Sequence, residues 1–266
     1  MNDFGNHLFS LSIGRPRCHK NLAVWPLMHR RRTPANAGNL AGALTDGTCT
    51  ASLLRAPGHF PAWLIRNRSS RALFAGSGEV LSTPAQSVTL IHSVVVGAGA
   101  CLELPATWLR PVAGSSADAG HELPAWTSGQ VGAVFCVDGI VRAIECFGDP
   151  DLARRAGVAS LNRFAAEAAN SRNLSTQVPA DRVLARWLRQ VVGVPLESVP
   201  TLGEGRSFRP VSGNHVGQLL TYNGSLLHAR FSEALRVRST VVRGFLPPRA
   251  NPRSVEQVTL ADPWAG

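Results

Sequence analysis

Residues 132–147 read GAVFCVDGIVRAIECF, and residues 217–231 read GQLLTYNGSLLHARF. In both stretches an apolar run is followed by Asp-Gly or Asn-Gly, and a second apolar run then closes on phenylalanine. An Asp-Gly or Asn-Gly pair accepts the positive φ angles of a two-residue turn between antiparallel strands. Both stretches therefore predict β-hairpins, with their turns at residues 138–139 and 223–224.

Short apolar runs separated by Gly, Pro, Ser and Asn predict further strands in the first half of the chain. These strands are expected at residues 22–27, where Pro26 ends the run, and at 48–54, 62–66, 72–75, 88–96 and 101–104. The 88–96 run is apolar on both sides, which is typical of one interior strand of a layered structure.

Helical periodicity appears in three places between these strands and hairpins. Leu40 and Leu44 indicate a short helix within residues 36–44. Asp149 and Pro150 begin a longer helix as N-cap and first helical residue, and an apolar stripe over residues 183–191 marks another. The whole pattern predicts an α+β fold: a mainly antiparallel, layered or sandwich-like β-sheet with two or three packed helices.

The composition predicts a folded protein with short polar ends. The chain has 266 residues, of which 44% are apolar and 17% charged, so it can bury a substantial core. We expect a single α+β domain over residues 11–235. Residues 1–10 are expected to form a flexible N-terminus, and residues 236–266 a loosely ordered basic tail in which prolines recur.

The formal net charge of +10 comes almost entirely from arginine, because Lys20 is the only lysine among 27 basic residues. Residues 1–35 carry six basic and one acidic side chain, and residues 236–266 carry five and two. The stretch between them is nearly neutral. The arginine excess is either a compositional preference or a means for the two ends to bind nucleic acid.

Several classes of protein are not expected. The longest apolar run, residues 94–104, is too short to span a bilayer, and the start lacks a signal-peptide pattern, so we expect a cytoplasmic protein without a membrane partner. The five cysteines include no C-x-x-C pair, which indicates reduced thiols. The histidines are scattered and no common catalytic or nucleotide-binding motif is present, so neither a metal nor a cofactor is expected.

Three polar residues are candidates for a site. Glu79 ends the tight Gly-Ser-Gly stretch at residues 76–78, and Gln86 follows shortly after it. His228 lies in the second hairpin, where a turn at residues 223–224 places it opposite Leu219. Each also has a structural interpretation: Glu79 as an exposed turn residue, Gln86 as a polar strand entry, and His228 as a buried, hydrogen-bonded side chain.

These stretches resemble those of the ARG- and rhodanese-phosphatase-superfamily-associated domain proteins. Residues 18–27, CHKNLAVWPL, are similar to the opening N-L-x-V-x-P-L of that family. Gly78-Glu79-x-Leu81 followed by Gln86 resembles its D-G-E-x-L-x-G-x-x-Q-N-R run, although Gln86 is all that remains of a K-Q-N-R group. The two hairpins resemble the middle and the end of the family, and the resemblance covers residues 13–235.

The family name implies genomic company with ADP-ribosylglycohydrolases and rhodanese-like phosphatases. Our leading hypothesis is therefore a catalytically weak or inactive domain that binds a small polar ligand, nucleotide- or ADP-ribose-like, or a partner protein. Glu79, Gln86 and His228 would supply the polar contacts. One alternative is a hydrolase of an ADP-ribose or phosphate-ester compound, with Glu79 as base and His228 as acid. A second is an RNA-associated protein that uses its arginine-rich ends.

Overall fold

The computed structural model describes residues 5, 7–8, 10–29, 37–54, 61–83, 86–108, 124–171, 175–211 and 214–234. The tail expected at residues 236–266 lies outside these residues, and so does most of the 1–10 segment. The limits of the expected 11–235 domain stay a prediction.

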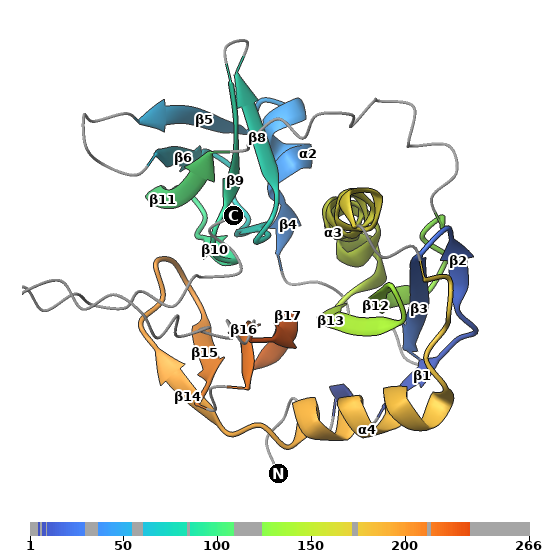
Figure 1. Cartoon of the computed structure of the whole chain (residues 1–266). Helices are drawn as coiled ribbons and strands as arrows, with labels where there is room; N and C mark the ends of the chain where they lie inside the picture. The colour runs from blue at the N-terminus through green and yellow to red at the C-terminus, as the bar shows by residue number, and fades with distance from the viewer. Residues whose placement is uncertain are drawn as a thin grey trace, which may run out of the picture.

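A nine-stranded antiparallel sheet forms the larger part of the fold (Figure 1). The two predicted hairpins lie side by side at its centre, because β13 pairs with β17. The sheet order is β1 (Leu11–Ile13), β3 (Leu22–His29), β12 (Gln130–Val137), β13 (Ile140–Phe147), β17 (Ser225–Glu233), β16 (His215–Tyr222), β15 (Arg206–Pro210) and β14 (Leu196–Val199), and β2 (Arg17–His19) pairs with β3 outside this path.

Both hairpins turn at the predicted residues. Asp138 and Gly139 have φ angles of 56° and 78°, and Asn223 and Gly224 have φ angles of 50° and 75°. Two successive positive φ angles are those of a type I′ turn, whose twist matches that of the flanking strands. The prediction of hairpins at 138–139 and 223–224 is confirmed.

Helices α3 (Pro150–Asn170) and α4 (Asp181–Val192) cover opposite faces of this sheet (Figure 1). Asp149 caps α3 as expected, since its carboxylate accepts hydrogen bonds from the first backbone N–H groups of the helix. Phe164 of α3 stacks on Phe135 at 4.4 Å, and Trp187 of α4 packs in a separate core cluster on the other face. Within the described part of the chain, no helix is long and apolar enough to cross a membrane.

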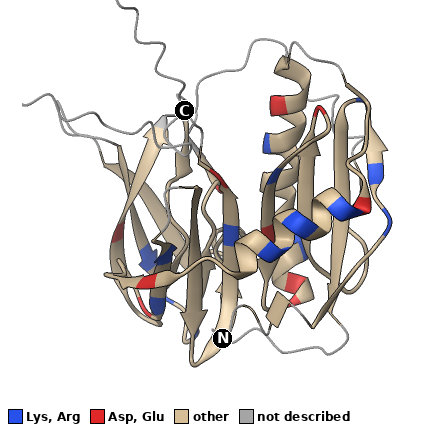
Figure 2. Ribbon diagram, turned by 60° about the horizontal axis from the view of Figure 1, so that its bottom comes forward, with Lys and Arg blue, Asp and Glu red and all other residues tan. Residues whose placement is uncertain are grey.

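The outer side of α4 is strongly basic. Figure 2 shows positive residues along this helix, and the sequence places three exposed arginines on it, Arg182, Arg186 and Arg189. The spacing of these residues puts them on the side that faces away from the apolar core.

A smaller β region lies on the same side of the large sheet as α3 (Figure 1). It begins with β4 (Gly38–Asn39) and the short helix α2 (Leu40–Thr45). A three-stranded sheet runs in the order β10 (Val94–Val96), β7 (Leu73–Ala75), β4, and a five-stranded sheet in the order β5 (Cys49–Leu54), β6 (Ala62–Asn67), β11 (Cys101–Trp108), β9 (Gln86–Leu90), β8 (Val80–Thr83).

The two regions share a core cluster. Phe74 and Val95 of the smaller region pack there with Phe147 and Leu220 of the large sheet, and the rings of Phe74 and Phe147 meet edge to face at 6.3 Å. The mainly antiparallel sheets with packed helices confirm the predicted α+β class.

Three local predictions were wrong. The single strand expected at residues 88–96 is interrupted at residues 91–93, because there the side chain of Gln218 replaces a neighbouring strand as the hydrogen-bond partner of Ser93. The first strand continues through Pro26 to His29, since the ring nitrogen needs no ladder bond and the Pro26 carbonyl still accepts one from Gly14. A bulge after Leu220 pairs His228 with Leu220 and not with Leu219.

The Asn223-Gly224 turn predicts a stability effect that arises from backbone conformation alone. Gly224 has a φ of 75°, and a Cβ built there meets no atom within 4 Å. Gly224→Ala should therefore lower the free energy of unfolding by about 1 kcal/mol, since a left-handed φ is strained for alanine. Gly224→Asn should cost less, because asparagine adopts this conformation more readily. Urea unfolding followed by circular dichroism measures both, and an alanine variant as stable as the parent contradicts the prediction.

Candidate functional site

His228 lies at the centre of a buried chain of hydrogen bonds. Its Nδ1 lies 3.0 Å from Ser93 Oγ, in the segment between β9 and β10, and its Nε2 lies 2.9 Å from Glu145 Oε1 on β13. The three residues are each at most 2% exposed. Strand pairing explains the second contact: Arg230 is directly opposite Glu145, so His228, two residues earlier on β17, projects from the same face.

Ser93 is held on every side by hydrogen bonds. Gln218 Oε1 accepts the Ser93 N–H at 2.9 Å, and Gln218 Nε2 donates to the Ser93 carbonyl at 2.9 Å and to Ser207 Oγ at 3.0 Å. The backbone N–H of Ser77 donates to Ser93 Oγ, also at 2.9 Å. The break between β9 and β10 is what frees the backbone of Ser93 for these contacts.

Glu145 and Arg230 form a pair of opposite charges inside the protein. Burial alone raises the pKa of Glu145, but the Arg230 guanidinium and the hydrogen bond from His228 outweigh it and leave the pKa below its ordinary value. Burial lowers the pKa of Arg230 to about 9 although Glu145 opposes this change. Both groups are therefore charged at neutral pH, and each compensates the other.

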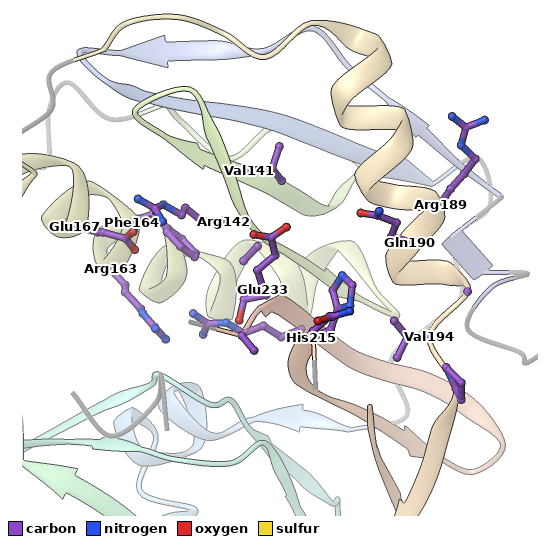
Figure 3. Close-up of a pocket in the computed structure, with 17 residues that line it drawn as sticks. Val141, Arg142, Arg163, Phe164, Glu167, Arg189, Gln190, Val194, His215 and Glu233 are labelled. Atoms are coloured by element: carbon purple, nitrogen blue, oxygen red, sulfur yellow. Dashed lines mark ion pairs between the residues drawn. The ribbon is translucent and has the colours of Figure 1, made fainter. Parts of the chain in front are cut away.

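Two cavities share the residues Arg230 and His215, and only the second is lined by members of the hydrogen-bond chain. The first has a volume of about 870 Å³ and lies among β13, α3, α4 and β17 (Figure 3). The second has a volume of about 590 Å³, and Ser93, His228 and Gln218 are part of its wall. Both volumes lie in the range of about 300–1,000 Å³ that is typical of small-molecule sites.

The first cavity is rich in arginine. Figure 3 shows Arg142, Arg163 and Glu167 grouped at one end, whereas Arg189 points away from the centre. The Arg142 Nε lies 3.2 Å from Glu167 Oε1. After burial, which is the main cause, the nearby Arg163 guanidinium further lowers the pKa of Arg230. Two like charges are thus held close enough to repel each other.

His215 contributes a neutral polar ring to both cavities. It begins β16 and is buried, and neither of its ring nitrogens has a hydrogen-bond partner among the described residues. Burial lowers the pKa of His215 more than Glu233 raises it. At neutral pH the imidazole therefore offers one donor and one acceptor.

The three candidates from the sequence, Glu79, Gln86 and His228, have different surroundings, and of the two whose side chains the structure describes only His228 lines one of the two cavities. His228 lies at the centre of the Ser93-His228-Glu145 hydrogen-bond chain. Glu79 lines neither cavity, and its Oε2 accepts a hydrogen bond from the Gly76 N–H of its own turn at 3.0 Å. Gln86 begins β9, and its side chain lies outside the described part of the structure. The backbone of the 76–79 turn lies next to Arg230 at Gly78. A Cβ added to Gly78 would lie 3.3 Å from Arg230 Nη1.

The sequence alone did not point to five residues around the site, namely Ser93, Glu145, Arg230, Gln218 and His215. A signal was present for two of them, because Glu145 and Arg230 are charged residues inside mainly apolar hairpin strands. The described residues contain no cluster of three or more His, Cys, Asp or Glu side chains that could hold a metal ion.

The structure thus has an α+β fold and a buried Ser-His-Glu chain, two members of which line the second cavity. Residues 113–232 match the model of the ARG and Rhodanese-Phosphatase-superfamily-associated Protein domain. This segment is therefore similar to the family that the sequence resembled. The matched segment contains Glu145, His228 and Arg230, and Ser93 precedes it. Neither the curated proteins nor the solved structures contain a match to the chain.

The position of Glu79 predicts a pH dependence of stability. Burial raises the pKa of Glu79 from 4.5 to about 7, although the Gly76 hydrogen bond opposes the change. Between pH 4.5 and pH 7 the folded protein holds a proton that the unfolded chain has lost, so this group reduces stability as the pH rises through that window. Relative to Glu79→Gln, the wild type should lose free energy of unfolding between those two pH values. Urea unfolding at each pH measures it, and a constant difference contradicts the prediction.

The buried charge pair predicts a large effect of neutralising Glu145. Glu145→Gln keeps an acceptor for His228 but removes the main charge that opposes Arg230, so we expect a loss of about 3–5 kcal/mol in the free energy of unfolding. The matched control is Glu197→Gln, which removes an exposed ion pair with Arg209 and should cost less than about 1 kcal/mol. Urea unfolding measures both losses. Equal losses in the two variants would show that the buried pair contributes no more to the free energy of unfolding than the exposed pair.

Proposed function

We propose that this protein binds a small anionic ligand, nucleotide- or ADP-ribose-like, in the first cavity. The observation that carries this proposal is that two guanidinium groups, Arg163 from α3 and Arg230 from β17, line the same cavity beside Phe164. Each lies 5.8 Å from the centre of the Phe164 ring. A phosphate group in this cavity would offset their repulsion and accept charge-assisted hydrogen bonds.

The rest of the cavity suits the remainder of such a ligand. His215 supplies a donor and an acceptor that have no partner among the described residues, so a ribose or base edge would satisfy them. Val141, Phe164 and Val194 supply apolar wall. A few polar groups within a partly apolar pocket is the usual composition of small-molecule sites.

His228 supports this site indirectly. Its hydrogen bond helps to keep Glu145 charged, and the negative charge of Glu145 compensates the positive charge of Arg230. Direct contacts of the ligand with Glu79, Gln86 or His228 stay a prediction. A hydrolase with Glu79 as base is less favoured, because its carboxylate is engaged by Gly76. RNA association through residues 236–266 concerns a segment outside the described residues.

Isothermal titration with ADP-ribose, ADP and ribose tests the proposal. We expect the two phosphate-bearing compounds to bind, ribose alone to bind far more weakly, and higher salt to weaken binding. Arg163→Gln should raise the Kd for ADP-ribose at least roughly tenfold, since a hydrogen bond to a charged group contributes about 1.5–3 kcal/mol.

The control is Arg154→Gln, on the same helix, whose exposed side chain pairs with Asp151 and does not line the cavity. It should leave the Kd unchanged. The proposal fails if neither phosphate compound binds at millimolar concentration, or if the two arginine variants lose affinity equally.

A further inference from the structure

We propose that Ser93, His228 and Glu145 act as a nucleophile, a base and an orienting carboxylate that hydrolyse small carboxylic esters in the second cavity. This activity is distinct from the binding of an anion in the first cavity. It rests on the hydrogen-bond chain, on the way Ser93 is held, and on the access that the cavity provides.

The protonation of the chain follows from its charges. The pKa of Glu145 lies below its ordinary value, so this carboxylate is ionised and accepts a hydrogen bond from the N–H at His228 Nε2. Arg230 already compensates the charge of Glu145, so His228 is not required to be cationic. In a neutral imidazole with a proton on Nε2, Nδ1 carries a lone pair, and the Ser93 hydroxyl must be the donor to it.

This direction of donation is what activates a serine. The base must lie within about 2.6–3.2 Å of the hydroxyl, and a third group must orient the base. Nδ1 lies 3.0 Å from Ser93 Oγ, and Glu145 lies 2.9 Å from the opposite ring nitrogen. Either imidazole nitrogen can serve as the base, because only the unprotonated one is needed.

Ser93 is also preorganised for attack. The Ser77 N–H that donates to its Oγ stabilises negative charge on the oxygen as the proton leaves. Gln218 fixes the backbone of Ser93 from both sides. A nucleophile held in this way loses little entropy when it reaches the transition state.

The second cavity brings substrate and site together. Ser93, His228 and Arg230 are in its wall with apolar side chains that include Val94, Leu202 and Phe208. The apolar part suits a short acyl chain, and the Arg230 guanidinium supplies positive charge for the oxyanion of a tetrahedral intermediate. A small ester of an aliphatic acid fits both features.

The reaction balances without a cofactor. Ser93 Oγ bonds to the ester carbonyl carbon as its proton moves to His228 Nδ1, and the carbonyl electron pair passes to oxygen. That pair returns as the bond to the alcohol breaks, and Nδ1 gives its proton to the departing alcohol. Water then attacks the acyl carbon, its proton passes through Nδ1 to Ser93 Oγ, and the carboxylic acid leaves.

The experiment uses the full chain with two probes, 4-nitrophenyl acetate and diisopropyl fluorophosphate. We expect turnover of the ester, and an adduct of the fluorophosphate on Ser93 that tandem mass spectrometry locates. Ser93→Ala should lower kcat/KM at least roughly 100-fold and abolish the adduct. The exposed Ser198 on β14 lies outside both cavities, and Ser198→Ala should leave turnover and labelling unchanged.

A second measurement does not depend on whether Ser93→Ala folds. In the wild type, turnover should fall in proportion to the fraction of Ser93 that carries the adduct. A purely structural chain would instead give a destabilised Ser93→Ala variant and no adduct. The proposal is overturned if Ser93 stays unmodified, or if turnover continues after it has been modified.

Discussion

The pairing of Glu145 with Arg230 is the constraint on which the centre of this fold depends. Two charged side chains are tolerated in an interior only when each compensates the other. Because they lie opposite each other on β13 and β17, they tie the two hairpins together in one register. A slip of one residue would move Arg230 to the face covered by α4 and separate the charges.

The same constraint places His228 and, through it, the smaller β region. His228 projects from the face of the large sheet that α3 and the smaller region share, and its second nitrogen meets Ser93. Ser93 can reach it only because the chain leaves the strand between β9 and β10, where Gln218 takes over its backbone bonds. The hydrogen-bond chain thus connects two regions that also share apolar core, and such satisfied polar networks rigidify the structure around them.

The two cavities relate differently to the family match. All residues that line the arginine-rich cavity except Glu233 and Ala234 lie within 113–232, so its proposed binding of an anion rests mainly on the segment that matches the family. The second cavity also needs Ser77 and Ser93, which precede that segment. Arg230 lines both cavities. An anionic ligand bound to it in one cavity would therefore reduce the positive electrostatic potential in the other.

The sequence by itself determined the two hairpins, the helix capped by Asp149 and the α+β class, because Asp-Gly and Asn-Gly turns and an N-cap act over a few residues. It also pointed to His228, but paired it with Leu219 because a bulge leaves no mark in an apolar run. Only the tertiary structure decided the partners of His228, since Glu145 and Ser93 are 83 and 135 residues away along the chain. The strand break at residues 91–93 was decided in the same way: local apolar periodicity favours a continuous strand there, and it is the distant Gln218 side chain that makes the interruption stable.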